Sequence, residues 1–225
     1  MNPVIELIDV CKSFTVGRET VTAVDHADLA VEPGELACVY GASGSGKTTM
    51  LSIMAGIDVA DAGVVRVAGH DLTGLSEGRR ADVRLRGIGV VFQSDNLLPE
   101  FTALENVVLP LLVRGVARDE ADDLAHSALA SVGLSALASR LPGHVSGGQR
   151  QRMGIARALA GGQSVLLADE PTGALDSDTS RHLFALIRSL CDDRGTAVVI
   201  TTHDPLAHGF ATSVHDMVDG MVSRR

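Results

Sequence analysis

Short apolar runs bounded by turn residues predict four buried strands in this chain. The runs span residues 36–40, 88–92, 164–168 and 196–201. Continuous apolar runs of this length are typical of parallel strands that are covered on both faces. The stretches between them have helical periodicity, as in residues 178–190, where leucine and isoleucine form one stripe. Strands that alternate with helices predict an α/β protein with a parallel sheet.

Two regions depart from this pattern. Residues 4–10 and 22–35 alternate between apolar and polar positions and contain a turn signal at Pro33 and Gly34, which predicts an antiparallel flap against the main sheet. Residues 94–159 have helical periodicity without a strand-like run. We therefore expect one domain, in which residues 1–93 and 160–225 form the α/β core with its β flap and residues 94–159 form an inserted helical lobe.

Each predicted strand runs directly into polar residues. A glycine-rich loop that begins at Gly41 follows the first strand, and Gln93 follows the second. The pair Asp169 and Glu170 follows the third strand, and His203 follows the fourth. In open α/β sheets, ligands bind at the carboxyl ends of the strands. The pattern therefore predicts that these residues gather around one site.

Composition excludes several classes of function. The formal net charge of −9 argues against a nucleic-acid partner, because phosphate binding needs clustered basic side chains. No apolar run approaches the roughly 20 residues of a membrane-spanning helix, and the amino terminus does not resemble a secretory signal, so the cytosol is the expected location. The three cysteines are far apart and lack metal-binding spacing, so we interpret Cys11, Cys38 and Cys191 as structural.

The glycine-rich loop carries a specific phosphate-binding pattern. Residues 41–48, GASGSGKT, match G-x4-G-K-[ST] and lie between a predicted strand and a predicted helix. Backbone amides and the helix N-terminus would hold the phosphates, while Lys47 would reach the β and γ oxygens and Thr48 would bind Mg²⁺. The alternative is an ordinary glycine-rich turn. The remaining predicted nucleotide contacts are Gly41, Ala42, Ser43, Gly44, Ser45, Gly46 and Thr49.

Two carboxylates end the third predicted strand, SVLLADE. Asp169 suits the Mg²⁺ shell, and Glu170 suits a base that positions and deprotonates the attacking water. His203 would contact a γ-phosphate, and Gln93 would orient water or bind Mg²⁺. Taken alone, the acidic pair is equally typical of a solvated strand end, and Gln93 of a capping amide. Beside a phosphate loop, these residues predict nucleotide hydrolysis.

The phosphate loop, the SGGQ stretch at residues 146–149 and DEPTGALD at residues 169–176, with His203 beyond, together resemble the ATP-binding cassette (ABC) ATPase family across nearly the whole chain. This resemblance implies a RecA-like phosphate-loop NTPase core with an antiparallel β flap and an inserted helical signature subdomain. It also implies ATP and Mg²⁺ as cofactors and a head-to-tail homodimer.

In that dimer, Ser146, Gly147, Gly148 and Gln149 would contact the ATP bound by the partner subunit, and Asp176 would lie at the dimer seam. Phe14 matches the aromatic residue that stacks on adenine, although a strand aromatic packed within the flap is the alternative and Tyr40 is the next candidate. Val145 stands where the family usually has leucine.

Residues 90–115 are similar to the ATPases of macrolide-exporter, lipoprotein-release and cell-division systems. The resemblance implies a peripheral subunit that works on a separate membrane permease at the cytoplasmic face. An importer subunit is the alternative within transport; a soluble ABC ATPase acting on DNA or ribosomes, a nucleotide sensor and a phosphate-loop kinase are the alternatives outside it. We interpret the apolar cluster Leu97, Leu98, Pro99 and Phe101 as a permease-docking site, with the core of the helical lobe as the competing interpretation.

Overall fold

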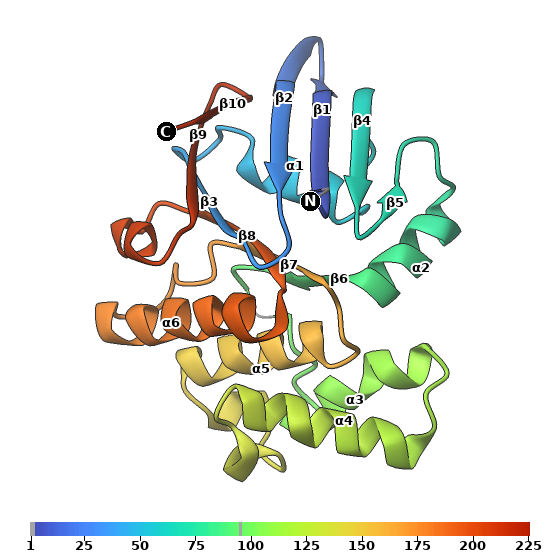
Figure 1. Cartoon of the computed structure of the whole chain (residues 1–225), viewed down its shortest axis with the longest axis vertical. Helices are drawn as coiled ribbons and strands as arrows, with labels where there is room; N and C mark the ends of the chain where they lie inside the picture. Colours follow the sequence, from blue (N-terminus) through green and yellow to red (C-terminus); the bar gives the residue numbers. More distant parts are fainter. Residues whose placement is uncertain (1–2, 95) are drawn as a thin grey trace.

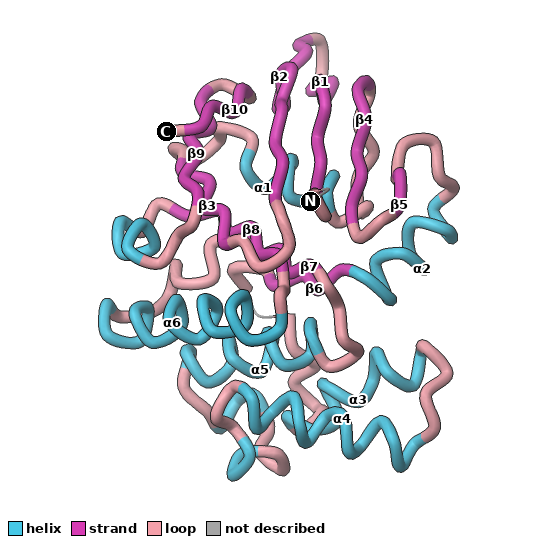
Figure 2. Tube along the Cα trace, in the orientation of Figure 1, coloured by secondary structure: helices cyan, strands magenta, loops and turns pink. Residues whose placement is uncertain are grey.

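Two sheets and a helical lobe make up the molecule (Figure 1). The structure is a computed structural model that describes residues 3–94 and 96–225. Figure 2 shows that most strands gather in one half of the molecule, while the four helices α3 to α6 occupy the other half. This arrangement confirms the predicted α/β fold with a β flap and an inserted helical region.

A six-stranded sheet forms the centre of the fold. Its order is β10-β9-β3-β8-β7-β6; all neighbouring strands are parallel except the antiparallel pair of β9 and β10. The four strands predicted from apolar runs are confirmed to within one residue at each end, and they are adjacent in the sheet. β9 and β10, which have alternating rather than continuous apolar positions, were not predicted. The strands are β3 (Leu36–Tyr40), β6 (Ile88–Val91), β7 (Val165–Asp169), β8 (Ala197–Thr202), β9 (Ser213–Val218) and β10 (Met221–Arg224).

Both faces of the central strands are covered, which explains their continuous apolar runs. On β3, Leu36 and Cys38 belong to a core shared with the helical lobe. The alternate residues Ala37 and Val39 belong to a second core, shared with α1 and the antiparallel sheet. The period of two along each strand therefore sends successive side chains into two different cores.

The predicted flap is a four-stranded antiparallel sheet with the order β2-β1-β4-β5. The turn at Pro33 and Gly34 exists, but it passes the chain to β3, whereas Gly17 and Arg18 form the turn between β1 and β2. A Pro-Gly pair indicates a turn without indicating which strands pair across it. The strands are β1 (Ile5–Val16), β2 (Glu19–Val31), β4 (Ala62–Val67) and β5 (His70–Asp71).

Residues 3–94 and 96–225 also contain six α-helices, and α3, α4 and α5 pack against one another in the lobe. Its expected limits, residues 94–159, stay a prediction. Among the residues that the structure describes, no helix is both long and apolar enough to cross a membrane. The helices are α1 (Lys47–Met54), α2 (Glu77–Gly87), α3 (Ala103–Val113), α4 (Arg118–Ser131), α5 (Gly147–Leu159) and α6 (Ser177–Arg194), with short 3-10 turns at Ser135–Leu137, Pro142–His144 and Pro205–Gly209.

The apolar segment before α3 divides between core and surface. Leu97 is 9% exposed and belongs to the core that the lobe shares with the sheet, so the docking interpretation was wrong for this residue. Leu98 and Phe101 are each 38% exposed. The buried Asn106 fixes the segment, because its amide nitrogen donates to the carbonyls of Leu98 and Phe101 while its oxygen accepts the amide of Leu98.

Acid destabilisation is expected from the buried His215 on β9. Burial, and secondarily the charge of Arg224, lowers the pKa of His215 below its usual value of 6.5. Below about pH 6.5, His215 therefore takes up a proton more readily in the unfolded chain than in the folded one. Protonation then favours unfolding, so the folded state loses stability as the pH falls below about 6.5. We expect His215→Gln to remove up to ~1.4 kcal/mol per pH unit from the acid-side slope of unfolding free energy. Urea unfolding at several pH values between 7.5 and 5 measures the slope, and equal slopes in both proteins would contradict this origin.

Candidate functional site

The predicted phosphate loop joins the end of β3 to the start of α1. Gly46 precedes the helix in a left-handed conformation with φ of 105°, and a Cβ atom there would collide with the carbonyl oxygen of Ala23 on β2. Only glycine allows this combination of backbone conformation and close approach. The loop therefore lies directly beneath β2, and the antiparallel sheet forms one wall of the site.

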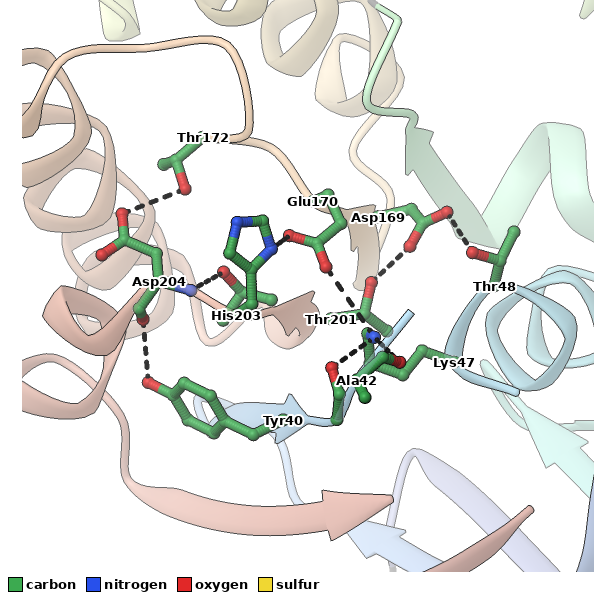
Figure 3. A network of polar contacts seen from close by, with 12 residues as sticks. Tyr40, Ala42, Lys47, Thr48, Asp169, Glu170, Thr172, Thr201, His203 and Asp204 are labelled. Atoms are coloured by element: carbon green, nitrogen blue, oxygen red, sulfur yellow. Dashed lines mark hydrogen bonds and ion pairs between the residues drawn. The ribbon is translucent and has the colours of Figure 1, made fainter. Parts of the chain in front are cut away.

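The ammonium group of Lys47 is buried at the centre of the loop. Its Nζ donates to the carbonyl oxygens of Gly41, at 2.7 Å, and Ala42, at 3.0 Å, and it lies 3.8 Å from Oε1 of Glu170 (Figure 3). A buried charge needs such partners because burial removes its hydration. These contacts place the positive charge between the loop and the acidic end of β7.

Asp169 connects the helix after the phosphate loop to the neighbouring strand β8. Thr48 Oγ1 donates to Asp169 Oδ2 at 2.8 Å, and Thr201 Oγ1 donates to Asp169 Oδ1. In the sheet, Asp169 is the register partner of Thr201. The role of Thr201 was not predicted, because a threonine in an apolar run is equally typical of a strand. Its position beside the predicted carboxylate follows only from the pairing of β7 with β8.

Glu170 lies between a cation and a histidine. Its Oε2 is 2.8 Å from Nδ1 of His203, while Oε1 faces Lys47 (Figure 3). The Glu170 backbone is left-handed, with φ of 46°, and its amide donates to the carbonyl of Thr201 at 2.9 Å. Few residues adopt this conformation without support from their surroundings, and it turns the chain at the strand end. The carboxylate is thereby directed back toward the phosphate loop.

Hydrogen bonds beyond His203 hold the loop that follows β8. Asp204 donates its amide to Thr202 Oγ1 and accepts from Thr172 Oγ1, and the Tyr40 hydroxyl donates to the Asp204 carbonyl at 3.2 Å. Burial is the main cause that raises the pKa of Tyr40 to about 12, so this hydroxyl keeps its proton. The sequence suggests Tyr40 only as a possible adenine contact, and this supporting network becomes visible only in the structure.

A cleft of about 580 Å³ lies over the phosphate loop. It brings together residues predicted at all four strand ends, and β2 supplies Val21, Thr22 and Ala23, which were not predicted. The predicted residues that line it are Gly41, Ala42, Ser43, Gly44, Gly46, Lys47, Thr48, Thr49, Gln93, Glu170 and His203. Ser45 and Asp169 lie under this surface: the Ser45 amide donates to the Ala42 carbonyl, and Asp169 contacts Thr48.

Phe14 is not among the described residues that line the cleft. It is 40% exposed on β1, pairs with Val21 in the sheet, and has Lys12 Nζ 5.1 Å from the centre of its ring. An exposed ring next to a cleft residue is available for stacking. The alternative, a ring packed inside the core of the flap, does not fit this exposure. Its contact with adenine stays a prediction.

Gln93 contacts the helical lobe through its backbone. Its carbonyl accepts a hydrogen bond from Nε2 of the buried Gln151 on α5 at 3.0 Å, while its side chain lies beside Gly173. The sequence signal for Gln151 was weak, because it lies in a polar run in which glutamines are usually exposed. This bond links the cleft directly to the helix that begins with the SGGQ stretch.

The SGGQ residues and Asp176 lie together at a separate surface, away from the cleft of their own chain. Ser146 begins α5 with a capping box: its Oγ accepts the Gln149 amide, and Gln149 Oε1 accepts the Ser146 amide. The amides of Gly147 and Gly148 have no acceptor within the helix. This end of α5 is an anion-binding position by its geometry.

Asp176 caps the neighbouring helix α6. Its carboxylate accepts from the amide and hydroxyl of Thr179, and the amide hydrogen bond is the main cause that holds the pKa of Asp176 below its usual value. Gly148 packs so closely on Thr179 that a Cβ atom would collide with its methyl group. The starts of α5 and α6 therefore form one rigid surface.

A phosphate loop, an acidic strand end and a second glycine-rich helix start, arranged in this way, define an ATP-binding cassette. The family described as ABC transporter matches residues 24–173. The lipoprotein-releasing system ATP-binding protein LolD of Syntrophotalea carbinolica is 44% identical over 220 residues, which cover 97% of this chain and 96% of that protein. LolD of Porphyromonas gingivalis is 41% identical over 220 residues, covering 97% and 98%.

Solved structures agree with these relatives. The dimeric structure of MJ0796, a bacterial ABC transporter cassette, is 38% identical, with a TM-score of 0.89 and coverage of 98% of this chain and 97% of that one. A dimeric post-hydrolysis state of the same cassette bound to ADP and Pi is 37% identical, with the same TM-score and coverage. The chain belongs to the ABC transporter family. It is an ATP-hydrolysing subunit, of the class that works as cassette dimers with membrane permeases.

Proposed function

We propose that this ATPase powers a permease of the lipoprotein-release and macrolide-exporter type from the cytoplasmic face of the membrane. Similarity to lipoprotein-releasing ATPases over nearly the whole chain supports this branch over the importer alternative.

The oxygen atoms around Asp169 fit a magnesium ion. Thr48 Oγ1 and Asp169 Oδ2 meet 2.8 Å apart beside the cleft, and Gln93 adds an amide oxygen at its wall. Hydroxyl, carboxylate and amide oxygens are the hard donors that Mg²⁺ prefers. The ion would neutralise charge on the β and γ phosphates when bound with ATP. Thr201 then acts as a positioning residue, because its hydroxyl holds the second oxygen of Asp169.

Glu170 is the base in this proposal. Its carboxylate faces the phosphate loop from the end of β7, and His203 holds one of its oxygens at 2.8 Å. His203 is 70% exposed, so its ring can contact a γ-phosphate while it stays beside Glu170. Lys47 would exchange its carbonyl contacts for phosphate oxygens, which carry full charges and bind an ammonium more strongly.

The separate surface formed by Ser146, Gly147, Gly148, Gln149 and Asp176 supports the head-to-tail dimer. The glycine amides lack acceptors within their own helix and do not line the cleft of their own chain. A second copy turned head to tail would bring them to the γ-phosphate in the partner's cleft. Both sites would then be complete only in the dimer.

A second hollow, of about 570 Å³, supports a permease contact between core and lobe. Its walls come from α2, β6, α3 and α5, and Leu109 and Val113 of α3 expose apolar surface there. Phe92, next to Gln93, also lines it. We assign this groove, in place of the Leu97 segment, as the seat for a cytoplasmic helix of the permease, because exposed apolar hollows mark interaction sites.

The proposed contact predicts a specific loss in Val113→Asp. Val113 is 66% exposed, so an aspartate there should leave folding intact but bury an unpaired charge once the permease binds. We expect permease affinity to fall about tenfold or more, with unchanged basal ATP hydrolysis. Co-purification from membranes with the permease subunits, followed by their identification, measures this and tests the assigned branch.

Val16→Asp is the matched control, because Val16 is 64% exposed at the far tip of the antiparallel sheet. It should co-purify with the permease as the unaltered chain does. If Val113→Asp co-purifies with the permease as well as the unaltered chain does, the groove is not the permease-binding site. Recovery of the chain with the permease of an importer would overturn the proposed branch.

A further inference from the structure

Three successive register shifts distort the pairing of β1 with β2, and the first two surround Cys11. Leu7 pairs with Leu29, Val10 with Ala27, and Lys12 with Val24. Two residues of β1 therefore oppose one of β2 at the first bulge, and at the second bulge Asp25 and His26 together oppose Cys11. Bulges redirect side chains that would otherwise alternate between the two faces of a sheet.

The second bulge gathers three different metal-binding side chains. Cys11, Asp25 and His26 each offer a ligand atom, and these atoms lie within 4.8 Å of one another. His26 is left-handed, with φ of 47°, so it does not follow the regular alternation from Asp25. The Asp25 amide donates to the Gly220 carbonyl at 2.9 Å, which ties this part of β2 to the end of the central sheet.

The first bulge supplies a partner for the histidine. Asp9, also left-handed with φ of 53°, places its Oδ1 2.5 Å from Nδ1 of His26. The Asp9 amide is in turn held by the Asp28 carboxylate at 2.9 Å. An Nδ1–H that donates to a carboxylate leaves the lone pair of the imidazole on Nε2, which lies 3.9 Å from Asp25 Oδ1. Metal-binding histidines in proteins are oriented by this kind of carboxylate contact.

We propose that Cys11 Sγ, Asp25 Oδ1 and His26 Nε2 form a binding site for a divalent transition metal of the Zn²⁺ class, with Asp9 as the residue that orients His26. Thiolate, imidazole and carboxylate ligands together suit this class rather than Mg²⁺ or Ca²⁺. Three protein ligands leave a fourth tetrahedral position to solvent, which agrees with the half-buried and exposed positions of these side chains. Ligand atoms within 4.8 Å need only a modest contraction around an ion.

Cys11 is also the most accessible of the three cysteines. Cys38 and Cys191 are buried, and burial raises the pKa of Cys38 to about 12 and that of Cys191 to about 11. Both therefore suit the structural role expected for all three cysteines. Cys11 is half-buried, and the His26 amide donates to its sulfur at 3.4 Å, so the sulfur is held at the bulge and stays accessible to an ion.

Titration of the full chain with Co²⁺, without nucleotide, tests the site. We expect one equivalent to produce the near-ultraviolet absorbance of a thiolate–cobalt bond, and Zn²⁺ to displace it. Cys11→Ser should abolish the absorbance, and His26→Ala should weaken binding at least tenfold. His70→Ala removes another exposed histidine from the same sheet and should bind as the unaltered chain does.

Asp9→Asn separates an orienting role from simple surface charge. It should weaken Co²⁺ binding about 10- to 100-fold and leave the thiolate absorbance at saturation unchanged. Thermal unfolding in EDTA checks that each variant folds. If a variant does not fold, the affinity of the site is measured instead on the unaltered chain, by isothermal titration with Zn²⁺ in competition with a chelator. Absence of the absorbance, its persistence in Cys11→Ser, or equal affinity in His26→Ala and His70→Ala would each overturn the proposal.

Discussion

Replacing Lys47 with alanine is expected to reduce ATP hydrolysis at least about a hundredfold. Lys47 holds its charge at the centre of the phosphate loop through the carbonyls of Gly41 and Ala42, 3.8 Å from Glu170. Its removal takes away the side-chain cation closest to the phosphate site and leaves Glu170 with His203 as its partner. Steady-state phosphate release by the purified chain, at saturating ATP and Mg²⁺, measures the loss.

Two further variants show whether the position of the charge matters. Lys47→Arg keeps a cation but replaces the compact ammonium with a planar group that does not fit between the loop carbonyls. This variant should therefore also hydrolyse ATP slowly. Arg66→Ala removes a cation from the antiparallel sheet, where it pairs with Glu6, and should hydrolyse ATP normally. Turnover of Lys47→Ala close to that of Arg66→Ala would contradict the assigned role.

Glu170→Gln is expected to trap a dimer with ATP bound. Glutamine keeps the size of the side chain and a polar neighbour for His203, which lies 2.8 Å from the carboxylate, but it cannot accept a proton from water. Hydrolysis should fall by about 10² to 10⁴, the usual contribution of a general base, while ATP affinity is kept. Size-exclusion chromatography with light scattering, in the presence of ATP, should show twice the mass of one chain.

Adding Ser146→Arg to Glu170→Gln tests which surfaces meet in that dimer. Ser146 is exposed at the start of α5, so an arginine there should be tolerated by the monomer at the loss of one helix cap, about 1 kcal/mol. We expect the double variant to bind ATP and stay monomeric. If the double variant forms a dimer of unchanged strength, the SGGQ surface lies outside the interface. If Glu170→Gln alone stays monomeric with ATP, the proposed head-to-tail dimer is wrong.

The chemistry-bearing residues could be found from the sequence because each lies in a short local pattern. The phosphate loop depends on glycines, a lysine and a threonine within residues 41–48, between an apolar strand and a helix. The structure places Lys47, Thr48, Gln93, Glu170 and His203 around one cleft, as the strand-end argument expected. The carboxyl ends of these strands lie at one edge because the strands are parallel, and their continuous apolar runs indicate this.

Residues that act through a neighbouring strand could not be found in this way. The four central strands have similar apolar runs, so nothing in them states that β8 lies between β3 and β7. Thr201 reaches Asp169 only because of that order. Gln151 similarly meets the Gln93 carbonyl only after α5 has packed against β6. β9 and β10 were missed because their half-buried alternation gives a weaker signal than a continuous apolar run.

The sequence by itself determined the α/β class, the phosphate loop, the acidic strand end and the glycine-rich start of α5, because each depends on backbone conformation and spacing within a few residues. The tertiary structure decided which side chains meet across strands: Asp169 with Thr201, Gln93 with Gln151, and Cys11 with Asp25 and His26. The bulge at Cys11 depends on the register between two strands, and register is set by the cores on which the whole sheet packs.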